Sequence, residues 1–295
     1  MTSIVIPAHN EARVIGRLLD SLLADSGPAG SGGSDGLGDS PDDTDIVVVC
    51  NGCTDDTAEI AAARGPRVRV VEIPVPSKHA ALRAGDDHAR GFPRLYVDAD
   101  VVIAGADVRA LTGPLADATS GILATAPVRR IPLASCAWRV RAYYQVWQRL
   151  PAVREGLFGR GVIAVSKAGH ARLAALPPLM ADDLAASLAF AAEERRVVDT
   201  AGVVIQPPRT WRDLIRRRVR AAVSTAQVEQ HQGPQGASAR TSKADLKALL
   251  RREPRLFVAM VVFLSAAVAA RRKAAKAVRA QDFNTWLRDE SSRQN

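Results

Sequence analysis

The chain has 295 residues and is 47% hydrophobic, so it is long enough and apolar enough to bury a large core. Its net charge of +9 is unevenly spread: residues 1–100 carry 9 Lys and Arg against 16 Asp and Glu, whereas the remainder carries 31 against 15. The basic remainder favours an anionic partner: a phosphate-bearing substrate, nucleic acid or a membrane surface. Three cysteines exclude a disulfide framework and the first residues do not resemble a secretory signal, so we expect a cytoplasmic protein.

Strands and helices are predicted to alternate over the first hundred residues. Short apolar runs predict strands at 2–6, 45–49, 68–73 and 95–97. Helical spacing predicts a helix that is capped by Asn10 and ends near 23, a second that is capped by Thr54 or Asp55 and ends at 63, and a third over 80–90. Residues 24–44 have little to bury and predict a flexible insertion. This alternation indicates a parallel sheet with helices on both faces, which binds ligands beyond the carboxyl ends of its strands.

Two carboxylates end the fourth predicted strand. Asp98 and Asp100 stand between the apolar runs 95–97 and 101–103, so negative charge is concentrated where a buried strand ends. A pair of oxygen ligands suits Mg²⁺ or Mn²⁺, and the cation would offset the cost of burying the charge. The spacing alone is a weak signal, because residues 43–45 repeat it in a Gly-rich stretch, and a solvated turn is the alternative.

Beyond residue 105 the pattern is less regular. Strands are predicted at 128–131 and 162–165, a helix at 180–194 and a basic helix at 211–220. Trp138, Tyr143, Tyr144 and Trp147 gather much of the chain's scarce aromatic content in one helical stretch, where they form either core packing or a platform for a sugar. Cys50 and Cys53 have the spacing of redox and zinc sites, but without a second pair they are more typical of small buried residues around a turn.

Four segments, in this order, resemble the family-two glycosyltransferases, whose fold is called GT-A. They are Ile-Pro-Ala-His-Asn-Glu at 6–11, Asn-Gly-Cys-Thr-Asp-Asp-Thr at 51–57, Lys78 ahead of a helix, and Asp98-Ala99-Asp100, and their order and spacing agree over residues 1 to about 225. The resemblance implies an α/β fold of GT-A type, with a mostly parallel Rossmann-like sheet flanked by helices and a helical C-terminal tail. It also implies a nucleotide-sugar donor, a divalent cation (Mn²⁺ or Mg²⁺) and inversion at the anomeric carbon.

The same resemblance assigns donor-binding roles to residues at the predicted carboxyl ends of the strands. They are Pro7, Ala8, Glu11, Asn51, Asp55, Lys78, Asp98 and Asp100. Asp98 would face the ribose, and Asp100 and Asp98 would hold the metal, which neutralises a diphosphate leaving group as a Lewis acid. Many relatives have Asp in place of Cys50 and use it to contact the base. With this departure, a UDP-sugar is still expected in preference to a GDP-sugar.

On the acceptor side the resemblance points to Gly159, Arg160 and Gly161, for which an ordinary turn is the alternative. Asp183 corresponds to the family's catalytic base, and Asp182 stands where Glu is usual; the alternative is that both are acids of a helix N-terminus. The Gln-x-x-Arg-Trp motif of processive relatives is absent. We therefore expect one sugar to be added to each acceptor, which is a small metabolite or lipid-linked.

The chain is accordingly divided into a nucleotide-sugar-binding half at 1–105, an acceptor half of the same domain at 106–228, a linker at 229–245 and a basic and apolar helical tail at 246–295. In the tail, the uncharged run 256–270 would reach about 22 Å, short of the ~30 Å hydrocarbon core, so a spanning helix is disfavoured. A helix packed on the domain, or lying peripherally on the inner face of an anionic membrane, is expected instead.

Two other functions fit parts of the pattern. A catalytically inactive protein of this fold would keep the donor-binding residues, and a nucleic-acid-binding protein would account for the basic charge. The second is disfavoured, and no nucleic-acid partner is expected, because the basic residues are not interleaved with aromatic ones and no binding motif occurs.

Overall fold

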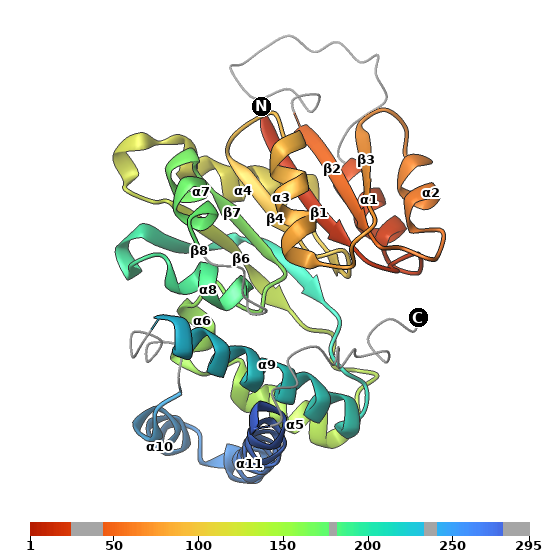
Figure 1. The fold of residues 1–295 in the computed structure, drawn as a ribbon. Coiled ribbons are helices and arrows are strands. Elements are labelled where there is room, and N and C mark those ends of the chain that lie inside the picture. The colour runs from red at the N-terminus through yellow and green to blue at the C-terminus, as the bar shows by residue number, and fades with distance from the viewer. Residues whose placement is uncertain (25–43, 177–181, 233–240, 280–295) are drawn as a thin grey trace. The chain divides into compact units, whose positions relative to one another are not determined.

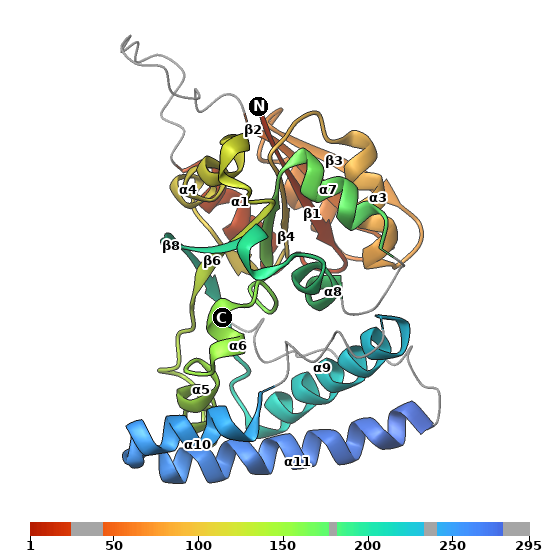
Figure 2. The ribbon, with the colours of Figure 1, turned by 90° about the vertical axis from the view of Figure 1, so that its left-hand side faces the viewer.

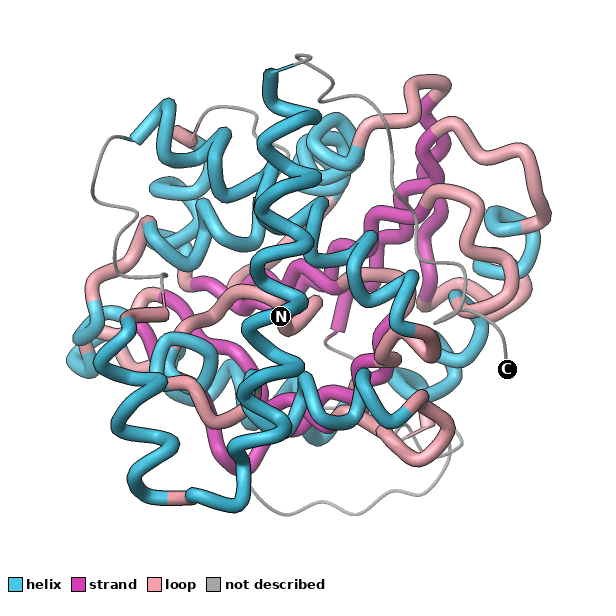
Figure 3. Tube along the Cα trace, turned by 90° about the horizontal axis from the view of Figure 1, so that it is seen from below, coloured by secondary structure: helices cyan, strands magenta, loops and turns pink. Residues whose placement is uncertain are grey.

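The computed structural model describes residues 1–24, 44–176, 182–232 and 241–279 (Figure 1). The chain forms two compact units. Unit 1 comprises Met1–Arg130, Gly159–Leu176 and Ala189–Ile205, and unit 2 comprises Ile131–Phe158, Pro177–Leu188 and Gln206–Asn295, so the chain passes between the units five times. All strands of the described residues belong to unit 1, whereas the elements described in unit 2 are helical. Figure 3 shows the strands in magenta and the helices in cyan. Apart from its two end residues, the insertion predicted at 24–44 lies outside the described residues.

Over its described residues, unit 1 is built on one sheet of eight strands in the order β3-β2-β1-β4-β7-β6-β8-β5. The strands are β1 (Thr2–Ala8), β2 (Thr44–Asn51), β3 (Val68–Ile73), β4 (Arg94–Val97), β5 (Val101–Val102), β6 (Ala124–Arg130), β7 (Val162–Val165) and β8 (Arg195–Ile205). The first four in the sheet are mutually parallel, and so are β6 and β8; β7 is antiparallel to both its neighbours, and β5 is antiparallel to β8. The prediction of an α/β fold with a mostly parallel sheet is confirmed.

The sheet is curled, and the acidic pair lies where the curl closes. Val97 ends β4 and Val101 begins β5, yet in the sheet β5 is four places away from β4. Four extended residues reach about 14 Å at most, whereas four strand spacings in a flat sheet measure about 19 Å. The sheet must therefore bend back on itself, so that Asp98–Asp100 connect a central strand to the far edge strand.

Helices cover both faces of this sheet. Those of unit 1 are α1 (Ile15–Leu23), α2 (Thr57–Ala62), α3 (Lys78–His88), α4 (Gly105–Ala116) and α7 (Lys167–Ala174), with the short 3₁₀ helices η2 (Ala118–Ser120) and η3 (Ala192–Glu194). In Figure 2, α1 and α4 lie on one side of the strands and α3 and α7 on the other. Gly85 allows α3 to approach closely, because a Cβ there would lie 2.2 Å from Cγ1 of Val5 in β1.

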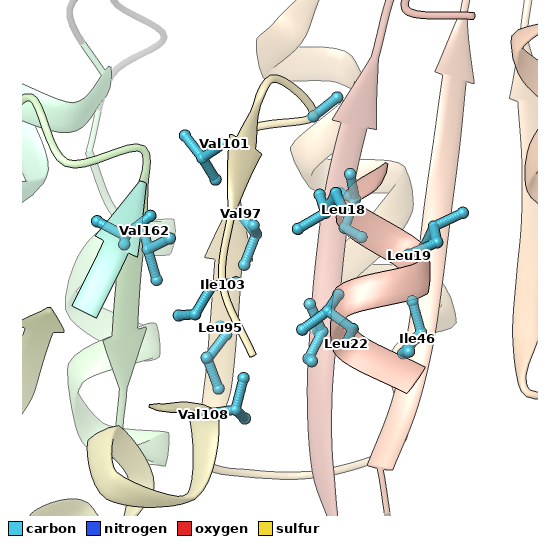
Figure 4. Packing of buried hydrophobic residues seen from close by; sticks show 14 of the residues in the cluster. Leu18, Leu19, Leu22, Ile46, Leu95, Val97, Val101, Ile103, Val108 and Val162 are labelled. Atoms are coloured by element: carbon cyan, nitrogen blue, oxygen red, sulfur yellow. The ribbon is translucent and has the colours of Figure 1, made fainter. Parts of the chain in front are cut away.

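The core explains why β2 is a continuous apolar run. Ile46 and Val48 belong to the large apolar cluster that contains Leu18, Leu19 and Leu22 of α1 (Figure 4), whereas Val47 and Val49 pack with Ala81 of α3. Successive side chains of a strand point to opposite faces, so a strand that is covered on both faces needs an apolar residue at every position.

Several predicted boundaries are wrong. Asn10 does not cap a helix: it has a φ of 53°, its side chain accepts the backbone N–H of Thr54, and α1 begins only at Ile15. Neither Thr54 nor Asp55 is the N-cap of α2, which begins at Thr57 after Asp56. The helix predicted at 180–194 is α8 (Asp182–Leu188), and it ends six residues early, because the chain returns to the sheet through η3 as β8.

Unit 2 has its own apolar core. Its helices are α5 (Trp138–Trp147), α6 (Pro151–Glu155), α8, α9 (Trp211–Gln232), α10 (Lys243–Arg252), the 3₁₀ helix η5 (Pro254–Leu256) and α11 (Phe257–Arg279). Tyr143 of α5 is buried and stacks on Phe263 of α11 with 5.2 Å between ring centroids, and Tyr144 is buried beside it. These two aromatic residues therefore pack the core, as one of the two predictions had it.

Candidate active site

The candidate site lies at the carboxyl edge of the parallel strands β3, β2, β1 and β4. The register pairs Val5 of β1 with Tyr96 of β4, so Asp98, two residues on, lies level with Pro7 at the end of β1. In the same way Ala8 is paired with Cys50, beside Asn51 at the end of β2. The fold thus brings the predicted donor residues of three chain segments to one edge, as the alternating pattern predicted.

The loops after β1 and β2 are held together by polar contacts. Asn51 is buried, and its side-chain amide donates to the carbonyl oxygen of Ala8 at 2.9 Å. His9 Nδ1 lies 2.6 Å from the carbonyl oxygen of Asn51, which requires the ring proton on this nitrogen. Asn10 accepts the N–H of Thr54 at 2.8 Å. These hydrogen bonds hold the two loops together, and the buried Asn51 contributes both its side-chain amide and its carbonyl oxygen to them.

Thr57 anchors Glu11 and Asp55 to the start of α2. The backbone N–H of Glu11 donates to Thr57 Oγ1 at 2.8 Å, and the Glu11 side chain is only 7% exposed. The Asp55 carboxylate accepts from the hydroxyl and N–H of Thr57 and from the N–H of Ala12. Burial alone would raise the pKa of Asp55, but these hydrogen bonds outweigh it and lower the pKa below its ordinary value. Asp55 is thus an anion at neutral pH, with its oxygens directed at protein donors.

Lys78 and Asp98 form an ion pair at this edge. Lys78 is the first residue of α3, whose N-terminus is capped by Ser77, and its Nζ lies 2.7 Å from Asp98 Oδ1. Both side chains remain about one-third exposed, at 33% and 39%, so the pair is open to solvent and to a ligand. An ammonium group beside a helix N-terminus is an environment that attracts phosphate oxygens.

The acidic pair suits a divalent cation, although the described residues hold no group of three or more His, Cys, Asp or Glu side chains arranged for a metal. Asp98 and Asp100 are both half-buried and lie in the short connection between β4 and β5. Mg²⁺ and Mn²⁺ commonly take one or two carboxylates and complete their coordination with water and substrate phosphates. A two-carboxylate site at a solvent-accessible edge meets that requirement.

The three predicted acceptor residues lie in the turn before β7, in unit 1. The carbonyl oxygen of Gly159 accepts from Arg129 Nε at 2.9 Å, and that of Gly161 accepts from the N–H of Asp98 at 2.7 Å. The Arg160 guanidinium is 2% exposed and donates to the carbonyl oxygen of Pro127 at 2.6 Å. Burial lowers the pKa of Arg160 to about 10. The turn is therefore supported from within, and the acidic pair is tied to it through Gly161.

The predicted base, Asp183, belongs to unit 2, unlike the donor residues. It lies in the first turn of α8, its side chain is exposed, and its Oδ1 accepts the N–H of Leu184 at 2.8 Å. Asp182 begins the same helix, and its side chain lies outside the described part of the chain.

Sequence reasoning predicted Cys50 and Cys53 as small buried residues around a turn, but it missed the contacts that support the site. Cys53 is half-buried, and its thiol contacts the carbonyl oxygen of Ala8 at 3.4 Å and the N–H of Asn10 at 3.5 Å, so it joins the same two loops. Cys50 is buried, which raises the pKa of its thiol to about 12. The roles of Asn10 and Thr57 depend on partners more than 40 residues away; only Gly52, which has a φ of 59°, gives a local signal of a tight turn.

Three comparisons bear on this arrangement. The profile described as "Glycosyl transferase family 2" matches residues 3–171. A dolichyl-phosphate beta-glucosyltransferase, ALG5C of Trichomonas vaginalis, is 38% identical over 104 residues, which is 34% of this chain and only 29% of that protein. Among solved structures, the mannosyltransferase PcManGT from Pyrobaculum calidifontis has a TM-score of 0.59 over 99% of this chain and 84% of its own, at 21% identity. TarS 1–349 of S. aureus has a TM-score of 0.51 at 14% identity, over 96% and 92%. At these identities the structures show a shared GT-A fold, which confirms that prediction.

Proposed function

The chain belongs to glycosyl transferase family 2, and we propose that it is a nucleotide-sugar-dependent glycosyltransferase, which moves one sugar per turnover from a nucleotide-diphosphate donor to a small metabolite or a lipid-linked acceptor. The observation that carries this proposal is the convergence of Lys78, Asp98 and Asp100 on the edge where the loops after β1 and β2 are held together. Convergent polar groups beyond the carboxyl ends of parallel strands are typical of nucleotide sites.

The donor is proposed to lie along this edge. Pro7, Ala8 and Glu11 would border the nucleoside, with Asn51 and Asp55 shaping the region of the base and ribose. A UDP-sugar is proposed in preference to a GDP-sugar. The Asp98 carboxylate would accept a hydrogen bond from a ribose hydroxyl, and its ion pair with Lys78 would fix the orientation of the carboxylate. The Lys78 ammonium would also face the donor phosphates.

Asp100, with Asp98 as the second carboxylate, would hold Mn²⁺ or Mg²⁺. When bound, the cation neutralises charge on the diphosphate leaving group. Because the Lys78 ammonium already partly offsets the charge of Asp98, Asp100 is the principal ligand in this proposal. The structure of PcManGT contains GDP-Man and Mn²⁺, which supports the requirement for a divalent cation.

Inversion needs a base that removes the proton of the acceptor hydroxyl as it attacks. Asp183 is the proposed base and Asp182 its neighbour, because the Asp183 side chain is exposed in the first turn of α8, where a helix N-terminus stabilises negative charge. The turn of Gly159, Arg160 and Gly161 is the proposed acceptor contact, through the partly exposed backbone of the two glycines, with the buried Arg160 guanidinium supporting the turn from within. Because the acceptor of the T. vaginalis relative is by its name dolichyl phosphate, a lipid-linked acceptor is chemically reasonable.

The proposed division of labour follows the predicted one. Residues 1–105 bind the donor, 106–228 contribute the acceptor side, and 246–295 form the tail after the linker at 229–245. The enzyme is proposed to act in the cytoplasm, peripherally at the inner face of the membrane if its acceptor is lipid-linked.

A donor panel tests the proposal. The protein is incubated with UDP-, GDP- and TDP-sugars, with Mn²⁺, with Mg²⁺ or with EDTA, and nucleotide release and donor binding are measured. Metal-dependent binding or release with at least one donor is the expected result. Failure to bind or release any donor under all conditions would contradict the proposed transferase activity.

A further inference from the structure

Helix α11 carries an exposed apolar stripe. Its members are Phe257, Val258, Val261, Leu264 and Val268, with side chains 62%, 64%, 52%, 44% and 48% exposed. Their spacing places them on one side of a 3.6-residue helix, so the exposed surface is continuous along about three turns. Single exposed apolar residues are ordinary, but a continuous row of five large ones indicates a binding surface.

The opposite side of α11 is buried within unit 2. Ala259, Met260, Phe263 and Ala266 are buried there, and Phe263 stacks on Tyr143 of α5. The helix is therefore already anchored by one side, and the stripe is not needed to hold it in the unit.

Basic residues flank the stripe at both ends. Arg251, Arg252 and Arg255 precede it and Arg271, Arg272 and Lys273 follow it, all with exposed side chains. Residues 256–270 contain no charged side chain. The nearby acid, Glu253, is paired with Arg149 at 2.9 Å and with Arg255 at 3.0 Å, so the local charge is strongly positive.

A helix with this composition can lie on a membrane or cross it. The segment Pro254–Ala275 is long and apolar enough to cross by length and composition, as the one such helix among the described residues. The packing argues against crossing, because α11 contacts α9, which carries Arg216, Arg217, Arg218 and Arg220. A spanning helix would take these charges into hydrocarbon, at a cost of several kcal/mol each.

We propose that the stripe of α11 lies in the interface of a bilayer that contains anionic phospholipids. Its five apolar side chains enter the acyl boundary, and the two basic clusters contact lipid phosphates at either end. Apolar insertion together with electrostatic attraction is the usual combination for interfacial helices. This inference concerns unit 2 alone and does not depend on the proposed sugar transfer.

Vesicle sedimentation with the full chain tests the proposal. Vesicles of phosphatidylcholine alone are compared with vesicles containing about one-third phosphatidylglycerol, at low salt and at 1 M NaCl, where the screening length falls to about 3 Å. We expect binding to the anionic vesicles at low salt, and at least tenfold weaker partitioning onto neutral vesicles or at high salt. Absence of binding to the anionic vesicles at low salt would overturn the proposal.

A charge-matched pair of variants locates the surface. Val261→Glu/Leu264→Glu should lower partitioning at least tenfold, whereas Ala171→Glu/Ala174→Glu, at the same spacing on exposed positions of α7 in unit 1, should change it less than twofold. Circular dichroism melting verifies that both variants are folded. Equal binding of the stripe variant and the native protein would place the contact elsewhere and contradict the proposal.

Two further measurements separate the other occupants of the stripe. If the native protein does not bind vesicles, and light scattering shows a dimer that the stripe variant no longer forms, the stripe would be assigned to contact with a second copy of the chain. Resistance of bound protein to extraction at alkaline pH would indicate a spanning helix. Either result would overturn interfacial docking, and neither depends on catalytic activity.

Discussion

The backbone N–H of Asp98 donates to the carbonyl oxygen of Gly161 at 2.7 Å, and this bond ties the end of β4 to the turn before β7. Gly161 has a φ of 66°, and a Cβ at this position would lie 2.5 Å from Val101 Cγ1 and 3.3 Å from Asp98 Oδ2. The acidic pair is thus positioned by a glycine about sixty residues later in the chain.

Gly161→Ala should therefore affect both stability and the donor site. We expect a loss of roughly 2 kcal/mol or more in the free energy of unfolding, from the left-handed backbone and from overpacking, together with weaker donor binding. Gly159→Ala is the matched control, because its φ is 62° but a Cβ there meets nothing within 4 Å. Urea unfolding and titration calorimetry measure both quantities; equal effects of the two substitutions would exclude a specific contact with Asp98.

Lys78→Met separates binding from stability. An ion pair this exposed contributes little to folding, so the unfolding midpoint should hardly move, whereas donor binding should weaken by about tenfold, equivalent to ~1.4 kcal/mol. Lys167→Met, at the first position of α7, is the control. If both variants bind the donor as the native protein does, Lys78 is a solvated helix-start residue and no more.

Asp100→Ala should abolish metal-dependent nucleotide release, by on the order of 10²-fold or more, and leave the melting temperature unchanged, because a half-buried residue in a connection contributes little packing. Asp87→Ala, on an exposed position of α3, should retain activity. Metal titration in the presence of donor verifies the cause. Full activity of Asp100→Ala would remove Asp100 from the site.

Asp183→Asn tests the proposed base. General-base removal typically slows a reaction by about 10² to 10⁴-fold, so sugar transfer should fall at least about a hundredfold while donor and metal still bind. Asp182→Asn should be affected less. The reverse ranking would exchange the two roles, and normal transfer by both variants would place the base elsewhere.

Acid should weaken the fold partly through Asp45, at the amino end of the sheet. Its buried carboxylate accepts from Ser3, Arg69 and the N–H of Arg90. Burial alone would raise the pKa of Asp45, but these partners lower it below 3.8. A lowered folded-state pKa stabilises the protein above the unfolded-state pKa, and this contribution is lost as the pH falls through the folded-state value.

Asp45→Asn should therefore cost roughly 2 kcal/mol near neutral pH, and the difference from the native protein should shrink below about pH 4. Urea unfolding from pH 7 to pH 2 measures this. The control, Asp87→Asn, should show a small difference throughout. A cost that stays constant down to pH 2 would show that Asp45 acts through shape and not through its charge.

Short strands could be predicted from the sequence where their signal is local. The prediction of 68–73 as a strand matches β3, and that of 162–165 matches β7, since both are short runs bounded by turns. β8 was missed because it mixes arginines and an aspartate with valines and opposes β6 across a shift in register at Pro127 and Val128. Its pairing depends on a strand about seventy residues earlier, which no local pattern reports.

The edge that carries the site could be predicted for the same reason, since alternating strands and helices determine where the strand ends gather. The supporting contacts could not. The left-handed backbone of Asn10 is stabilised by Thr54, and the direction of the Asp98 side chain by Lys78, and each pair is separated by at least twenty residues. The curl of the sheet could not be predicted either, because it follows from the long-range pairing of β5 with β8.

The five passages of the chain between the two units limit how this protein can be divided or recombined. No single cut releases either unit as a continuous stretch. A fragment that ended at residue 228 would keep α5 but lose the α11 residues that pack on it, such as Phe263, and would expose the interior of unit 2. We therefore expect such fragments to be insoluble, and we expect variation in acceptor or donor preference to arise by substitution within the chain and not by exchange of whole modules.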